Sequence, residues 1–282
     1  MADLPYLFDL SGGVAVVTGG CGLLGTQFCR AMASAGARVV VADINRQKAI
    51  TLADSLNELA TPALATGSGP RSLAVRTDVT KPDSVQEMVA ATLETFDRLD
   101  ILVNGAALDP KFDPDHAGAH TNSFEDYPLE AWNQALEVNL TGMFLCCQAA
   151  IPAMLEQGKG IIINISSIYG MVGPDQRIYQ QESAPVQYKP VYYSVTKAGV
   201  LSLTRYLATY YAGRNIRVNT LTPGGVYDGH DARFVQAYSA RAVMGRMARK
   251  DELDGALLFL ASDASSYMTG ANLVLDGGWT AW

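Results

Sequence analysis

Cysteine and histidine are scarce in this sequence, and their placement argues against a disulfide framework or a metal centre. The 282 residues include four cysteines and three histidines. No two cysteines form a Cys-x-x-Cys pair, and the adjacent Cys146 and Cys147 lie in an apolar run typical of a buried helix. His116 and His120 are four residues apart, but the Gly, Pro and Asp around them favour a loop. We expect reduced, buried thiols and no metal site.

Long apolar runs and basic blocks are also missing. No stretch approaches the roughly 18 uninterrupted apolar residues of a membrane-spanning helix. The opening MADLPYLFDL has acidic residues where a secretory signal peptide has basic ones. Acidic residues outnumber basic ones by 28 to 21, for a net charge of −7, with no basic cluster. These absences argue against membrane insertion, export and nucleic-acid binding, so we expect a cytoplasmic protein.

Short apolar runs alternate with helical patterns along the chain. The strand candidates are rich in Val, Ile and Leu, as strands buried on both faces should be; they are Val14–Thr18, Arg38–Ala42, Leu73–Arg76, Ile101–Val103, Ile161–Ile165, Arg217–Leu221 and Asn272–Leu275. The helix candidates are Leu23–Ala35, Arg46–Leu59, Pro82–Phe96, Leu129–Glu156, Val191–Ala212, Ala232–Met244 and Lys250–Ala261. This alternation predicts an α/β fold of the Rossmann type, a doubly wound parallel sheet of about seven strands with helices on both faces. We expect a single domain over residues 1–282.

Three loops are expected on the ligand side of this sheet, at about residues 107–127, 169–190 and 224–245. The loops that leave the carboxyl ends of parallel strands form the ligand crevice, and long loops in compact domains are often functional. Residues 61–70 are expected to form a flexible surface connection.

A glycine-rich segment, TGGCGLLG at 18–25, lies between the first predicted strand and the first predicted helix. Glycines let the backbone approach a pyrophosphate, and the helix N-terminus favours its charge. Asp43 ends the second strand, 24 residues after Gly19, where a carboxylate can bond a ribose 2′-hydroxyl and repel a 2′-phosphate. The pattern predicts NAD rather than NADP, a preference that the nearby Arg46 weakens.

Tyr193 and Lys197 are four residues apart and therefore share one face of a predicted helix. A nearby ammonium lowers the pKa of a phenol, and a phenol so tuned can exchange a proton with an alcohol oxygen. Alone, the pair is weak evidence for catalysis, because a solvated helix face is its ordinary explanation. Its significance comes from the glycine turn and from Ser166 and Ser167 at the end of a preceding strand.

Seven ordered motifs make the chain resemble the short-chain dehydrogenase/reductase family from about Leu10 to Trp282. They are TGGCGLLG at 18–25, VNGAA at 103–107, VNLTG at 138–142, INISS at 163–167, YSVTK at 193–197, RVNTLTPGG at 217–225 and YMTGANLVLDGGW at 267–279. The resemblance implies an oxidoreductase that interconverts a secondary alcohol and a ketone by hydride transfer with a nicotinamide cofactor. It also implies a homodimer or homotetramer.

The resemblance implies a role for individual residues. Tyr193 is expected to be the general acid/base, with Lys197 lowering its pKa and holding the nicotinamide ribose. Ser167 is expected to orient the substrate oxygen, with Ser166 as the alternative. Asn139 is expected to hold a water that links the lysine to solvent, or to be a buried hydrogen-bonding residue. The cofactor residues expected in all are Gly19, Gly22, Leu23, Leu24, Gly25, Asp43, Asp78, Val79, Asn104, Ala106, Tyr193, Lys197, Pro223, Gly224 and Val226.

Some of these cofactor residues have alternative roles. Asp78 is placed either to reach the adenine or to lead into the next helix, and Asn104 is expected to brace the central sheet.

Three departures from the family pattern also stand out. The turn follows Gly-x-x-Gly-x-x-Gly, with Leu23 at a usual glycine position, and resembles the extended branch that includes nucleotide-sugar epimerases. Asn-Gly-Ala-Ala replaces the usual Asn-Asn-Ala-Gly, and the 26 residues from Ser167 to Tyr193 exceed the family norm. An NAD-retaining nucleotide-sugar epimerase or dehydratase therefore stays open as an alternative.

Charged loop residues favour a polar, hydroxylated substrate such as a sugar, sugar acid or polyol, because a steroid or acyl pocket would be lined by apolar side chains. The expected substrate contacts are Asp109, Ser167 and Arg177. Arg177 is placed either to meet a carboxylate or phosphate or to be a solvated loop charge. The apolar, aromatic tail Gly278–Trp282 is expected to pack at a subunit interface.

Overall fold

The computed structural model describes residues 4–58, 69–109, 122–180 and 187–282. Most of the flexible connection expected at 61–70 lies outside these residues, as do His116, His120 and the predicted end of a helix at Leu59. The loops expected at 107–127 and 169–190 are described in part.

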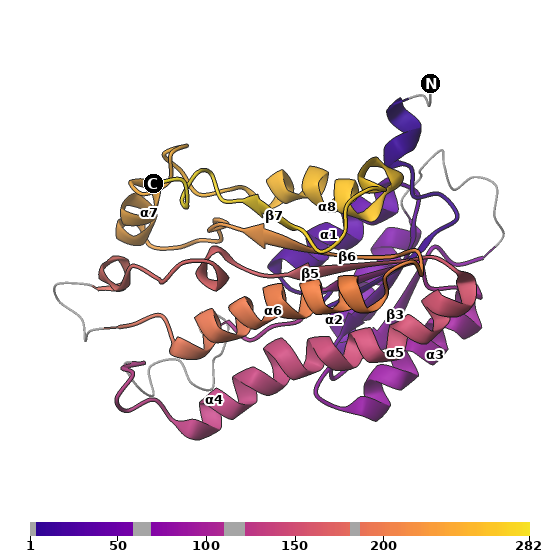
Figure 1. Cartoon of the computed structure of the whole chain (residues 1–282), viewed down its shortest axis with the longest axis horizontal. Helices are drawn as coiled ribbons and strands as arrows, with labels where there is room; N and C mark the ends of the chain where they lie inside the picture. Colours follow the sequence, from indigo (N-terminus) through magenta and orange to yellow (C-terminus); the bar gives the residue numbers. More distant parts are fainter. Residues whose placement is uncertain (1–3, 59–68, 110–121, 181–186) are drawn as a thin grey trace.

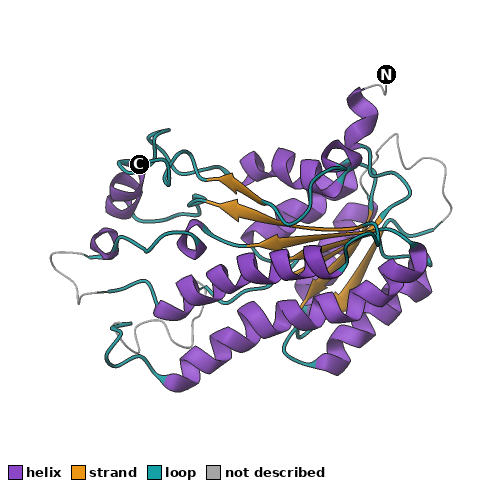
Figure 2. Ribbon diagram, in the orientation of Figure 1, coloured by secondary structure: helices purple, strands orange, loops and turns teal. Residues whose placement is uncertain are grey.

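Seven parallel strands form one sheet in the order β3-β2-β1-β4-β5-β6-β7 (Figures 1 and 2). The strands are β1 (Val14–Thr18), β2 (Arg38–Asp43), β3 (Ser72–Arg76), β4 (Ile101–Asn104), β5 (Gly160–Ile165), β6 (Ile216–Pro223) and β7 (Asn272–Leu275). The strand order reverses at β1, which pairs with β2 on one side and with β4 on the other. A ligand crevice forms at such a point, outside the carboxyl ends of the strands. The predicted doubly wound sheet of the Rossmann type is confirmed.

Helices cover both faces of the sheet (Figure 2). They are α1 (Leu23–Ser34), α2 (Arg46–Asn57), α3 (Pro82–Phe96), α4 (Leu129–Leu136), α5 (Gly142–Gln157), α6 (Val191–Tyr210), α7 (Ala232–Ser239) and α8 (Asp254–Ala261). Alternate residues of β1 serve different cores: Ala15 and Val17 pack with α1, α2 and α8, whereas Val14 and Val16 pack with α3, α5 and α6. Burial on both faces is why the strands read as continuous apolar runs.

The long helix predicted over Leu129–Glu156 is interrupted. A π-helical turn, Glu137–Thr141, separates α4 from α5 and carries the buried Asn139. Such turns widen the helix locally and occur often at functional sites. Taken together, α4, the π-helical turn and α5 (Leu129–Gln157) are long and apolar enough to cross a membrane. However, 56% of the apolar window in this segment is buried inside the structure. Its composition is therefore explained by packing against the sheet, and it is weak evidence for a membrane span.

Two helices near the C-terminus differ from the prediction. α7 ends at Ser239 rather than Met244, because the Met244 N–H donates to the Gly277 carbonyl at 2.9 Å and Gly245 adopts a φ of +66°. The helix predicted from Lys250 opens with a 3₁₀ turn, and α8 follows it. Because α7 ends early, the chain that follows it packs against the C-terminal segment around Gly277.

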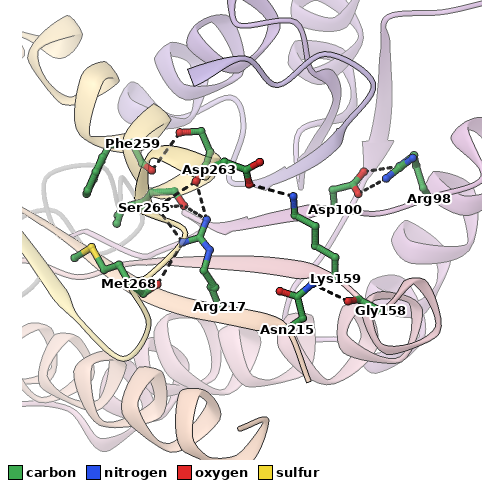
Figure 3. Close-up of polar contacts among 12 residues, drawn as sticks. Arg98, Asp100, Gly158, Lys159, Asn215, Arg217, Phe259, Asp263, Ser265 and Met268 are labelled. Atoms are coloured by element: carbon green, nitrogen blue, oxygen red, sulfur yellow. Dashed lines mark hydrogen bonds and ion pairs between the residues drawn. The ribbon is translucent and has the colours of Figure 1, made fainter. Parts of the chain in front are cut away.

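An arginine near the N-terminal end of β6 fixes the segment that leads into β7 (Figure 3). The Arg217 guanidinium donates to the carbonyls of Leu260, Ser262 and Met268 and to the Ser265 hydroxyl, at 2.9 to 3.3 Å. Burial lowers its pKa. Because backbone and hydroxyl groups satisfy this guanidinium, its role is to hold the connection between α8 and β7.

Candidate active site

A cleft of about 830 Å³ lies at the carboxyl ends of the strands, with walls from the glycine turn, from α6 and from the loops after β4, β5 and β6. The expected site residues that line it are Gly19, Gly22, Leu23, Leu24, Gly25, Asp109, Ser167, Tyr193, Lys197, Pro223, Gly224 and Val226. Seven expected residues lie outside its lining, namely Asp43, Asp78, Val79, Asn104, Ala106, Asn139 and Arg177. The structure thus brings the glycine turn, the Ser167–Tyr193–Lys197 set and one acidic loop residue to a single cavity.

The glycine turn is packed so tightly that side chains are excluded. Gly19 has a left-handed φ of +64°, and a Cβ there would lie 2.7 Å from Ala106 Cα. A Cβ on Gly25 would lie 2.0 Å from the Gly19 carbonyl oxygen. No side chain caps α1 at Gly22, so the positive end of this helix faces the cleft through backbone groups. These features fit a dinucleotide pyrophosphate.

Asp43 stands beside the turn at the end of β2. Its carboxylate accepts the Cys21 N–H at 2.9 Å and the Asn45 N–H at 2.9 Å. Asn45, rather than Asp43, caps α2 by accepting the Lys48 N–H. Lys48, not the expected Arg46, lines the cleft. The acid is therefore held at the rim of the turn with a basic side chain nearby.

Asp78 and Val79 lie after β3 in mainly local contacts. Asp78 accepts both the N–H and the hydroxyl of Thr80, at 3.0 and 2.7 Å, and its own N–H donates to the Ser84 hydroxyl. Val79 is 7% exposed and packs against Gly142 at the start of α5. Of the two readings of Asp78, the contacts favour the lead into α3.

Asn104 braces the sheet rather than lining the cleft. Its side-chain N–H₂ donates to Asn164 Oδ1 at 2.9 Å, and Asn164 in turn donates to the Thr204 hydroxyl at 2.9 Å. This links β4, β5 and α6 through buried polar groups. Gly105 and Ala107, the neighbours of Ala106, line the cleft instead.

Tyr193 and Lys197 project from the first turns of α6 into the cleft. The Lys197 ammonium donates to the Ile165 carbonyl at 2.9 Å and lies 5.8 Å from the centre of the Tyr193 ring. Burial lowers the pKa of Lys197 to about 8; Asp109 opposes this shift and Lys189 reinforces it. Lys197 is therefore a buried amine whose pKa of about 8 lies close to neutral pH.

The phenol differs from the expectation of a pKa lowered by Lys197. Burial, followed by the Asp109 carboxylate, raises the pKa of Tyr193, and a hydrogen bond with Ser167 lowers it. The physical reason is that the protein interior disfavours the charged phenolate and that the Asp109 carboxylate repels it.

The two serines after β5 have different contacts. The Ser166 hydroxyl donates to the Lys197 carbonyl at 2.8 Å and so anchors α6. The Ser167 hydroxyl accepts the Tyr169 N–H at 3.3 Å and is close enough to the Tyr193 phenol to lower its pKa. Gly170 lets this turn approach α6, since a Cβ there would lie 2.5 Å from the Lys197 carbonyl oxygen. Of the two hydroxyls, the one on Ser167 faces the phenol.

Asn139 clamps a backbone segment. Its amide accepts the Leu108 N–H at 2.6 Å, donates to the Leu108 carbonyl at 3.1 Å and contacts the Thr196 hydroxyl at 3.4 Å. Of the two roles considered for Asn139, these contacts match the buried hydrogen-bonding residue. The clamp fixes the loop after β4 immediately before Asp109.

The two charged loop residues expected to contact substrate have different environments. Asp109 lines the cleft and pairs with Lys189 at 3.1 Å. Arg177 pairs with Asp175 at 2.8 Å, and its side chain is 79% exposed. Asp175 also pairs with Arg241. Arg177 is thus an exposed, ion-paired loop residue outside the cleft lining, and its contact with substrate stays a prediction.

Sequence reasoning missed an aromatic wall on the substrate side. It is formed by Tyr169, Tyr179, Phe234 and Tyr238, which all line the cleft. The Tyr179 hydroxyl donates to that of Tyr169 at 2.9 Å. All four residues lie in loops expected at the ligand side, at 169–190 and 224–245, where the sequence drew attention to charged rather than aromatic residues. Their spacing along the chain gives no signal that the rings converge.

The aromatic tail packs within its own chain. Trp279 is buried and stacks on Tyr238 with ring centres 4.2 Å apart, while Trp282 is 80% exposed and donates to the Arg241 carbonyl at 3.0 Å. Trp279 thus supports the aromatic wall from behind. Of the tail, Ala281 and Trp282 are exposed and so available to an interface.

Known proteins match nearly the whole chain. A family model described as enoyl-(acyl carrier protein) reductase matches residues 22–280. The chain is 38% identical over 272 residues to a cis-4-hydroxycyclohexanecarboxylate dehydrogenase of Sinomonas cyclohexanicum, covering 95% of this chain and 96% of that protein. It is 35% identical over 283 residues to a D-threitol dehydrogenase of Mycolicibacterium smegmatis, covering 99% and 96%. A crystal structure of a gluconate 5-dehydrogenase from Burkholderia cenocepacia J2315, in complex with NADP and tartrate, matches with a TM-score of 0.84 and 28% identity over 99% of this chain and 100% of that one.

The fold and the cleft define a nicotinamide-dependent oxidoreductase. With the family model and these relatives, the chain belongs to the short-chain dehydrogenase/reductase family, as its motifs predicted. It is an enzyme that acts on CH–OH groups and interconverts a secondary alcohol and a ketone. The named relatives are dehydrogenases, and none carries the name of an epimerase or dehydratase.

Proposed function

We propose that this protein is an NAD-dependent dehydrogenase of a hydroxylated secondary alcohol, with Tyr193 as its general acid/base. The observation that supports this most is the meeting of Ser167, Tyr193 and Lys197 in the cleft that the glycine turn also lines. When bound, the nicotinamide accepts a hydride from the alcohol carbon or returns one to the ketone.

Each side chain then has a defined task. Tyr193 takes the proton of the alcohol during oxidation and returns it during reduction. Ser167, whose hydroxyl lies beside the phenol, donates to the substrate oxygen as negative charge develops there. The Lys197 ammonium, 5.8 Å from the Tyr193 ring centre, would offset part of the cost of forming the phenolate in the buried cleft and would hold the nicotinamide ribose. Asn139 acts indirectly, because its contacts hold the loop before Asp109 and the first turns of α6.

Residues around the cleft would hold the cofactor from end to end. The turn at Gly19–Gly25 would bind the pyrophosphate, and Pro223, Gly224 and Val226 would lie beside the nicotinamide. Asp43 supports NAD, since its carboxylate beside the turn would bond a 2′-hydroxyl and repel a 2′-phosphate. Lys48 offsets part of this discrimination. We expect NAD to be preferred and NADP to be used less well.

The substrate side favours a small polyhydroxylated or cyclic alcohol. Its aromatic wall suits the CH face of a ring or carbon chain, and Asp109 with Lys189 supplies a polar end. The relatives named for 4-hydroxycyclohexanecarboxylate, threitol and gluconate act on compounds of this kind. A role in carbohydrate or polyol metabolism follows.

The chain is proposed to act as one catalytic domain in a cytoplasmic homodimer or homotetramer. Apolar and aromatic side chains stay exposed along α5 and α6, among them Phe144, Val195, Tyr206 and Tyr210. Pairing these helices between subunits would cover them. Light scattering that gives a stable monomer at micromolar concentration would contradict this assembly.

The function is tested by NADH or NADPH absorbance with purified protein and a panel of polyols, sugars, sugar acids, cyclic alcohols and hydrophobic secondary alcohols. The proposal predicts net reduction of NAD, at a higher kcat/KM than for NADP, with hydroxylated compounds. Cofactor that stays bound through purification, with no net reduction on any alcohol, would instead support the epimerase or dehydratase alternative.

A further inference from the structure

Two loops meet beside Tyr193 through one ion pair. Lys189 Nζ lies 3.1 Å from Asp109 Oδ1 and 4.0 Å from the centre of the Tyr193 ring. Both residues line the cleft, and the lysine side chain is only 13% exposed. A lysine over an aromatic face is favourable in itself, but here it also brings a donor and an acceptor next to the proposed general base.

The backbone on both sides of the pair is held in place. Gln176 accepts the Lys189 N–H at 2.8 Å and donates to the Lys189 carbonyl at 3.3 Å. Asn139 makes the same two-sided contact with Leu108, the residue before Asp109. A pair fixed from both loops differs from a surface contact between long, mobile side chains, and such preorganisation is what a recognition site needs.

The chemistry of the pair favours a neutral hydroxyl as its ligand. A hydroxyl both donates and accepts hydrogen bonds, so it can bond Asp109 and Lys189 together without separating them. A carboxylate could accept from the lysine but would be repelled by the adjacent Asp109 carboxylate. The aromatic wall formed by Tyr169, Tyr179, Phe234 and Tyr238 completes the pocket with surfaces that suit CH groups.

The place of the Asp109–Lys189 pair beside Tyr193 determines which hydroxyl of the substrate the pair can bind. The ammonium is 4.0 Å from the ring centre of Tyr193. Because the pair lies against this ring, a substrate whose reacting oxygen meets the phenol would bring the groups on its adjacent carbon within reach of the pair. We propose that Asp109 and Lys189 form a specificity site for a hydroxyl on the carbon next to the one oxidised, so that the enzyme selects vicinal diols. This inference rests on the proposed dehydrogenase function.

The expected discrimination is moderate. A site whose buried polar groups lose every partner rejects an analogue that lacks the hydroxyl by several orders of magnitude. Here the two charged groups keep each other as partners when no second hydroxyl is present. We therefore expect a preference of about 10- to 100-fold in kcat/KM for a vicinal diol over the matched mono-alcohol, as for one hydrogen-bonding contact with charged groups.

The test compares butane-2,3-diol with butan-2-ol, and cyclohexane-1,2-diol with both cyclohexanol and cyclohexane-1,4-diol, by NADH formation. The variants are Lys189→Met, Lys189→Arg and Asp109→Asn. The control is Lys159→Met, which removes another Lys–Asp pair, with Asp263, at the same 3.1 Å but exposed and far from the cleft (Figure 3). Lys189→Met and Asp109→Asn should bring the vicinal-to-mono ratio down towards one, Lys189→Arg should keep part of it, and Lys159→Met should keep all of it.

The contrary outcomes are distinct. A wild-type enzyme that oxidises these alcohols without a vicinal preference overturns the specificity site and leaves the proposed function standing. The same holds if Lys189→Met slows the diol and the mono-alcohol by an equal factor, because the lysine then acts on the chemistry or the fold. A wild-type enzyme that binds NAD but oxidises neither these alcohols nor any compound of the wider panel refutes the proposed function itself, and the specificity site with it. If Lys189→Met does not fold, the ratios of Asp109→Asn and Lys189→Arg decide.

Discussion

Replacing Gly25 by alanine should abolish tight cofactor binding, although alanine is the better residue for a helix. The added Cβ would lie 2.0 Å from the Gly19 carbonyl oxygen and 2.9 Å from Gly20 Cα. Backbone atoms cannot swing aside, so the turn has to open by about 1 Å, and a displacement of that size can cost on the order of 100-fold in function. We expect the Kd for NAD to rise at least about 100-fold and the free energy of unfolding to fall by about 1–3 kcal/mol.

The matched control is Gly255→Ala in α8, a helical glycine with nothing within 4 Å of its Cβ position. It should leave the Kd unchanged and stabilise the protein by up to about 1 kcal/mol through helix propensity. Titration calorimetry with NAD and thermal unfolding measure both quantities. A Gly25→Ala protein that binds NAD within twofold of wild type would show that the turn does not hold the pyrophosphate.

Three further predictions concern the serines, the buried lysine and the arginine of β6. Ser167→Ala should lower kcat/KM by about 10²–10³-fold, because a hydroxyl facing the developing charge is lost. Ser166→Ala should keep most activity and lower the free energy of unfolding by about 1 kcal/mol. Equal losses of kcat/KM in the two variants would contradict the assignment of Ser167. For Lys197, the pKa of about 8 in the folded state is below its ordinary 10.5, so the unfolded chain binds more protons between those values and stability should rise with pH there. Denaturant unfolding should show this rise in wild type relative to Lys197→Met, by up to about 3 kcal/mol, and a flat difference would refute it. Arg217→Met should destabilise the protein by about 2–4 kcal/mol, because four acceptors lose their donor. The Kd for NAD of the folded variant should be unchanged. A melting temperature equal to that of the wild type would show that these contacts are dispensable.

The sheet and the glycine turn were predictable because their sequence signals are local. The five residues of β1 are all buried, and a run buried on both faces has to be apolar throughout, which is why its predicted bounds match the observed ones. The glycines at 19 and 25 are required by contacts within the turn itself. The bounds of α7 were wrong, because the residues after Ser239 bond the distant Gly277 segment.

Loop charges were not predictable in the same way. Arg177 and Lys189 lie in the same insertion and carry the same charge, yet Arg177 pairs with Asp175 at the surface while Lys189 lies beside Tyr193. The difference depends on the partner from the other loop, Asp109, and no spacing rule encodes it. The position of Asn139 on a π-helical turn is likewise set by packing between α4, α5 and α6 rather than by a local signal.

The central claim is that Tyr193 transfers the proton, and Tyr193→Phe tests it most directly. NADH formation would be followed with the best alcohol of the panel, and the Kd for NAD would be measured on the same preparation. The account predicts that turnover falls by about 10²–10⁴-fold while the Kd stays within about threefold, because the phenyl ring preserves the wall of the cleft. Turnover near the wild-type rate in a protein that still binds NAD would contradict it.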